Sequence, residues 1–150
     1  MCAAYLDKYL GQIIEFRLPG LNSELKSKIF SPDGILGTFA SRIDIGTALK
    51  SIDGELSHDL KLIASLRNKF AHELTISTFD HPEILKQLDK MRYRPRIIDG
   101  DKQKDKEILE RYEKLNRRQR FEVIGTFMCM SLHNTLHTVA TVLKKHGAKD

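Results

Sequence analysis

The sequence predicts an all-α protein, a single helical bundle of five or six helices, two of them long. Apolar residues recur at three- and four-residue spacing over most of the 150 residues. Glycines and prolines are confined to a few places, which favours helices over short strands joined by many turns. The β-branched stretch 75–79 is one short segment with nothing to pair with, so we assign it to a loop.

The first five expected helices occupy the first ninety or so residues. Their expected ranges are 2–17, 24–30, 38–52, 56–74 and 82–91. The first range begins without a capping residue, so we expect either an uncapped helix or a natural chain that begins further upstream. The third range is apolar on more than one side, as expected of a buried helix, and Gly46 within it suggests the close approach of a neighbouring helix.

The second half is expected to contain a charged connector and one long helix. Residues 92–116 form a charged connector or an insertion, with a helical stretch at 105–115. Asn116 and Gln119 have the spacing of a capping box and open the longest helix, 117–146. A chain of this length is expected to form one domain, 1–150.

Composition and motifs exclude several function classes. Cys2 and Cys129 suggest neither a disulfide framework nor a zinc site. No apolar run is long enough for a bilayer, and Asp7 interrupts any secretory signal, so we expect a cytoplasmic protein without membrane contact. There is no P-loop, dinucleotide fingerprint or nucleophile elbow, and we expect no cofactor. The net charge of +5 permits contact with nucleic acid but does not require it.

Two further patterns are interpreted conservatively. His133 and His137 have i, i+4 spacing but lack the glutamate and third ligand of a zinc site, so we expect two surface histidines and no metal. Residues 24–49 are the only candidate for a helix-turn-helix, and the second helix is too apolar to lie in a major groove. Direct reading of DNA sequence is therefore not expected.

The stretch from Leu56 to Leu74 carries the main candidate site. Arg67 falls in the middle of its apolar stripe, which consists of Leu56, Leu60, Ile63, Ala64, Phe70, Ala71 and Leu74. A guanidinium buried there needs compensation, so we expect Arg67 to pair with a carboxylate, to bind a ligand or to reach back to water. The candidate carboxylates are Asp44, Asp7 and Glu15.

Two polar residues accompany Arg67 at the edge of the stripe. Asn68 and His72 are about 40° apart around the helix. His72 either caps the end of its helix or takes part in a site. With Arg42 of the central helix, these residues form the candidate binding set: Arg42, Arg67, Asn68 and His72.

A second basic stretch lies at the start of the connector. Arg92, Arg94 and Arg96 alternate with other residues, and Tyr93 lies between the first two. Such a stretch is either a solvated connector or a loop that contacts phosphate or nucleic acid.

Two segments resemble the mannitol operon repressor family. They are Gly34-Ile35-Leu36-Gly37-Thr38-Phe39-Ala40-Ser41-Arg42-Ile43 and Leu66-Arg67-Asn68-Lys69-Phe70-Ala71-His72, within a resemblance that covers residues 2–90. The resemblance implies an all-helical cytoplasmic protein tied to repression of mannitol uptake genes. It also implies action through protein partners, because the family carries no obvious DNA-binding module.

The run Arg67-Asn68-Lys69-Phe70-Ala71-His72 also resembles the motif of HEPN-type domains. That resemblance implies a metal-independent ribonuclease in which Arg67, Asn68 and His72 act on RNA across a homodimer. Because Arg67 and His72 are about 140° apart around an ideal helix, one protomer alone would hardly focus both on one phosphate.

The sequence therefore predicts a transcription-regulatory protein that acts through a protein partner, such as another transcription regulator, rather than by direct DNA readout. We favour this class over an enzyme. The HEPN-like ribonuclease is the alternative.

Overall fold

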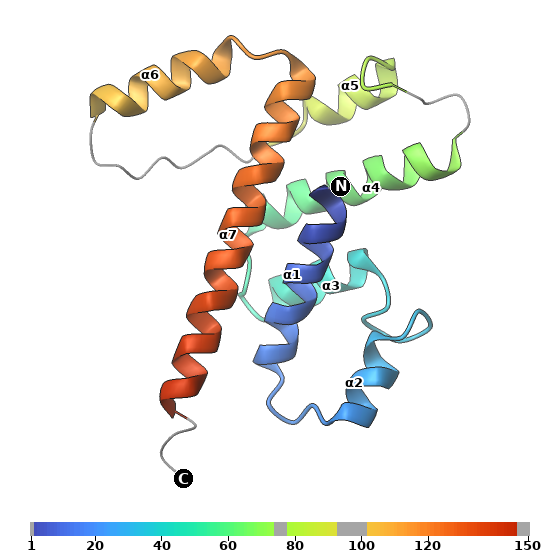
Figure 1. Cartoon of the computed structure of the whole chain (residues 1–150). Coiled ribbons are helices and arrows are strands. Elements are labelled where there is room, and N and C mark those ends of the chain that lie inside the picture. The colour runs from blue at the N-terminus through green and yellow to red at the C-terminus, as the bar shows by residue number, and fades with distance from the viewer. Residues whose placement is uncertain (1, 74–77, 93–101, 147–150) are drawn as a thin grey trace.

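The computed structural model describes residues 2–73, 78–92 and 102–146, and within them every regular element is an α-helix (Figure 1). The helices are α1 (Cys2–Arg17), α2 (Ser23–Phe30), α3 (Phe39–Ala48), α4 (Gly54–His72), α5 (Pro82–Leu88), α6 (Lys102–Glu113) and α7 (Arg117–His146). The predicted all-α class is confirmed, and α4 and α7 are the longest helices. Residues 75–77 of the expected loop lie outside the described residues.

The predicted count of five or six helices is wrong, because the described residues form seven. The helical stretch predicted at 105–115 within the charged segment is present as α6, which spans Lys102–Glu113 and adds to the count. The capping box before α7 is confirmed, since the Asn116 and Gln119 side chains each accept a hydrogen bond from the other residue's backbone N–H, at 3.0 and 2.9 Å. This box separates α6 from α7.

The main hydrophobic core forms where α1 packs against both α7 and α3, with α4 beneath (Figure 1). Gly46 marks the closest approach, because a Cβ atom there would lie 2.8 Å from the Leu10 side chain. The predicted close contact of a neighbouring helix is therefore present, and that helix is α1. The fully buried residues of this core are Leu6, Leu10, Ile13, Ile14, Ile43, Leu60, Ile63, Met128 and Leu132.

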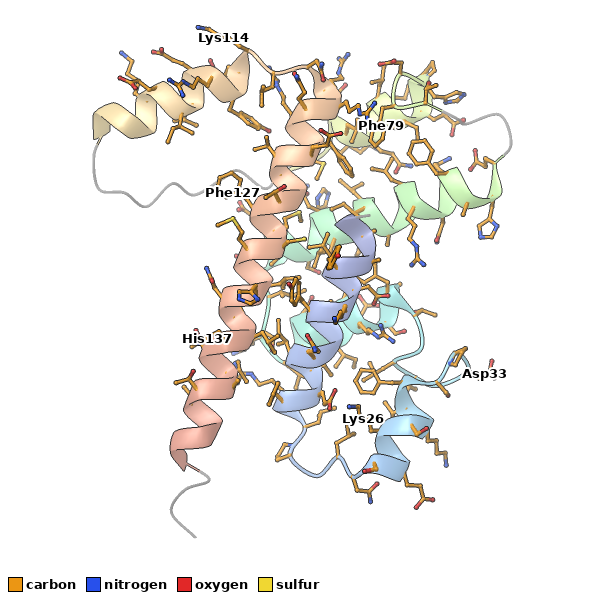
Figure 2. All side chains as sticks on the ribbon, viewed as in Figure 1. Lys26, Asp33, Phe79, Lys114, Phe127 and His137 are labelled. Carbon is orange, nitrogen blue, oxygen red and sulfur yellow. The ribbon has the colours of Figure 1, made fainter. Side chains whose placement is uncertain are left out.

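A second, smaller cluster joins the other half of α4 to α5 and to the start of α7. Leu66 and Ile84 are buried in it, and Phe70 packs on their edge. Phe79, labelled in Figure 2, has its ring centroid 5.3 Å from those of both Phe70 and Phe121. Aromatic pairs at this separation add to the stabilisation from burial. The two halves of α4 thus pack against different neighbours.

The connection from α2 to α3 is a tight turn held by glycines. Cβ atoms on Gly34 and Gly37 would lie 2.3 Å from the carbonyl oxygens of Ile29 and Ser31. The Thr38 side chain then accepts a hydrogen bond from the N–H of Ser41 and caps α3. The two glycines of the segment 34–43, which resembles the mannitol operon repressor family, therefore have a structural reason: the backbone contacts there leave no room for a larger residue.

Candidate functional site

Arg67 does not lie in the core, contrary to the expectation from helical periodicity. Its side chain is exposed, as are those of Asn68 and His72. In the second half of α4, the buried side is set by Leu66 and Phe70, which face α5 and α7. Leu66 points about 100° away from Arg67 around the helix. The other side of this half of α4 is left uncovered, so Arg67 faces solvent.

The three carboxylates expected to neutralise Arg67 bind other cations. Asp7 accepts a hydrogen bond from Arg42 at 2.7 Å, and Asp44 pairs with Lys61 at 2.7 Å. Glu15 pairs with Lys26. Within the described part of the chain, none of these acids pairs with Arg67. Arg67 is thus a surface cation, available to an external partner.

Arg42, also expected in the binding set, is used inside the fold. Its Nε donates to the Leu36 carbonyl at 2.8 Å, and its Nη1 donates to Asp7 on α1. Its guanidinium carbon lies 5.5 Å from the centroid of the Phe30 ring. The Arg42 side chain is 17% exposed. These contacts tie α3, the α2–α3 turn and α1 together, so the structure gives Arg42 an architectural role.

A groove of about 470 Å³ runs along α4 beside Arg67. It brings Asn68 and His72 together with Lys61 and Lys69, while Arg67 lies outside its lining. The remaining lining residues are Ala40, Ala64, Ser65 and Glu73. The groove thus presents amide, imidazole and ammonium groups, which are suited to a polar or anionic partner surface.

Lys69 braces one edge of this groove to α5. Its ammonium donates to Glu83 at 2.7 Å and to Glu73 at 3.1 Å. These hydrogen bonds, the one with Glu83 first, raise the pKa of Lys69 above 10.5. The hydrogen bond from Lys69 lowers the pKa of Glu83 below 4.5. The brace fixes the position of Lys69 without neutralising Lys61 or His72.

The sequence analysis missed Asp59, a fully buried carboxylate on α4. Its two oxygens accept hydrogen bonds from the backbone N–H of Arg92 at 3.0 and 2.9 Å, and one contacts His58 Nδ1 at 2.8 Å. Asp59 therefore fixes the backbone of Arg92, after α5, against α4. Arg92 itself has an exposed side chain, and Arg94 and Arg96 lie outside the described residues. A signal was present, because Asp59 falls beside Leu56 and Ile63 on the helical projection.

His133 and His137 are exposed on α7, as predicted for surface histidines. His133 packs edge-on against Tyr9, with ring centroids 5.6 Å apart. No helix in the described residues has the length and hydropathy needed to cross a membrane.

The architecture defines an all-α protein with an exposed polar groove on its second-longest helix. No protein-family model and no curated protein matches the chain. Among solved structures, it is similar to a chain in the X-ray structure of the MtlR–HPr complex from Escherichia coli. The TM-score is 0.54 at 16% sequence identity, over 92% of this chain and 85% of that one. This similarity shows that the fold is MtlR-like.

Proposed function

We propose that this chain is a cytoplasmic regulator of the mannitol operon repressor type, a single domain that acts by binding a protein partner. The observation that carries this proposal is that the fold resembles MtlR over 92% of the chain. The structure of MtlR was solved in complex with HPr. The exposed groove supports it, because Asn68, His72 and the neighbouring Arg67 are surface groups without a described internal role.

The chemistry of the groove fits a protein surface better than a small-molecule site. None of its lining residues is buried, whereas small ligands are held in clefts that bury most of their surface. Exposed Arg67 lies beside it and would meet acidic side chains of a partner. HPr is the partner to test first, because it is the protein bound in the structure of similar fold.

The test is a calorimetric titration of the purified chain with HPr from the same organism. Binding by the wild type, weakened at least tenfold by Arg67→Glu, would support both the partner and the site. Arg118→Glu is the matched control, because Arg118 is also an exposed helix cation but lies on α7. No binding of HPr by the folded wild type would contradict HPr as the partner.

Direct DNA readout is tested separately. We expect the purified protein to show no sequence preference for an operator fragment, because α3, the second helix of the helix-turn-helix candidate, buries Phe39, Ile43 and Gly46 in the bundle. A gel shift that resists competitor DNA at physiological salt would contradict this part of the proposal.

The second candidate is the HEPN-like ribonuclease, favoured by the exposure of all three motif residues, Arg67, Asn68 and His72. In that reaction His72 would move a proton and Arg67 would hold phosphate. We expect no cleavage of single-stranded RNA by the wild type in the presence of chelator. Cleavage that His72→Ala abolishes would instead support the ribonuclease.

A further inference from the structure

An apolar groove opens between α6 and α7, away from the polar groove on α4. Six apolar or aromatic residues line it together with Arg111: Ile108, Leu109, Tyr112, Leu115, Val123 and Phe127. Ile108 and Leu109 are 40% and 47% exposed. In Figure 1, α6 extends away from the other helices, and Figure 2 shows Phe127 on the side of α7 toward α6. Within the described part of the chain, this groove is left open.

The outer side of α7 continues this surface without charge. From Val123 to Leu143 the sequence contains no Lys, Arg, Asp or Glu, in a chain in which 30% of residues are charged. Met130, on this helix, is 54% exposed. Exposed helix faces are normally covered with charged residues, and a face depleted of charge is typical of the core of a protein interface.

The charges along α6 indicate what fits the groove. Lys106 and Glu113 are seven residues apart, so they lie on the same edge of the strip formed by Ile108, Leu109 and Tyr112. If a second α6 runs antiparallel about a twofold axis near Leu109, Lys106 of each copy lies opposite Glu113 of the other. On the other edge, Arg111 of each copy comes beside Glu107 of the other. A parallel twofold pair would instead place Lys106 beside Glu107 of the other copy and Glu113 beside Arg111, so the identity of the paired residues distinguishes the two arrangements.

We propose that this surface binds a second copy of the same chain. The α6 helix of each copy lies in the α6–α7 groove of the other, and the pair buries Ile108, Leu109 and Phe127. The charge pattern of α6 favours this occupant, because it is complementary to itself in this antiparallel twofold arrangement.

Such a dimer leaves the polar groove free in both copies. In Figure 1, α6 and the C-terminal end of α4 lie at opposite sides of the molecule. The Arg67–His72 surfaces would therefore not meet across this interface, in contrast to the dimer that the HEPN-type motif implies. This inference does not depend on the proposed function.

The experiment is analytical ultracentrifugation of the full chain over a range of concentrations. We expect a dimer of twice the 17.2 kDa chain mass, and a monomer for Leu109→Glu. Leu25→Glu is the matched control, since Leu25 is 41% exposed but lies on α2, and this variant should remain dimeric. A wild type that stays monomeric at about 100 μM, or a dimer unaffected by Leu109→Glu, would overturn the proposal.

Exchanging the charges of Lys106 and Glu113 provides a second test of the dimer if Leu109→Glu fails to fold. Lys106→Glu and Glu113→Lys should each weaken the dimer by roughly tenfold, because each places like charges together. The double variant Lys106→Glu/Glu113→Lys should restore the dimer, since the pairs are re-formed with reversed sign. Absence of this rescue, with both single variants folded, would exclude the antiparallel arrangement.

Discussion

Arg42 and Asp7 form a partly buried ion pair, 2.7 Å between Nη1 and Oδ1, that joins α3 to α1. Because Arg42 also donates to the Leu36 carbonyl, one guanidinium holds the turn and both helices in place. The resemblance motif that contains Arg42 therefore includes a junction between α3, the turn before it and α1.

Arg42→Ala should lower the free energy of unfolding by about 2 kcal/mol, because it removes two charge-assisted hydrogen bonds and leaves Asp7 without this partner. The measurement is urea denaturation followed by circular dichroism. Lys61→Ala is the control: its pair with Asp44 has the same 2.7 Å length but is more than half exposed, so a loss within about 0.5 kcal/mol is expected. Equal effects of the two variants would contradict the architectural role of Arg42.

Gly34→Ala and Gly37→Ala should each destabilise the protein by roughly 1–3 kcal/mol, because the added methyl would overlap a backbone carbonyl and force the turn to shift. Gly20→Ala tests whether the loss is specific, since a Cβ atom there has no neighbour within 4 Å. Thermal unfolding of the three variants gives the comparison. If Gly34→Ala unfolds at the wild-type temperature, the turn is not as tightly packed as described.

Arg67→Ala and His72→Ala should change the free energy of unfolding by no more than about 0.5 and 1 kcal/mol, because both side chains are exposed. If Arg67 were buried and paired with a carboxylate, Arg67→Ala would lower the free energy of unfolding by about 3–5 kcal/mol. Denaturant unfolding distinguishes these values. A large loss for Arg67→Ala would show that the residue supports the fold and would weaken its assignment to the partner surface.

The stabilisation from the Lys69–Glu83 ion pair between α4 and α5 should depend on pH. Because Lys69 lowers the pKa of Glu83, the stabilisation is complete above the ordinary value of 4.5 and is lost as the pH falls below it through the pKa in the folded state. The raised pKa of Lys69 acts in the opposite direction, so its contribution is complete below 10.5 and is lost at higher pH.

Glu83→Gln should therefore have a melting temperature that falls less than that of the wild type as the pH is lowered below 4.5. Added salt should reduce the difference, since the pair is at the surface. Identical pH profiles for the two proteins would show that the brace contributes nothing to stability.

Periodicity predicted the helical class and the range of the longest helix, 117–146, which agrees with α7. It could not predict the exposure of Arg67, because a helical projection treats a stripe as covered along its whole length. In the structure the neighbours of α4 change between Ile63 and Leu66, and the buried side rotates with them. Which helix covers which turn is a tertiary property that no local pattern contains.

The buried acid shows the same limit. Asp59 has the polarity of a surface residue, and its partner is the backbone N–H of Arg92, a group that every residue except proline carries. Only the path of the chain after α5 brings that group to the carboxylate. Sequence could indicate that Asp59 lies on the apolar side, but not what satisfies it.

The pairing of α1 with α7 has a consequence for synthesis of the protein. The two helices begin at Cys2 and Arg117, 115 positions apart, yet they pack directly against each other. On the ribosome, the side of α1 that contacts α7 therefore stays uncovered until almost the whole chain has been made. The α1–α7 contact can form only after α7 has been synthesised. Until then, the apolar side of α1 is accessible to chaperones.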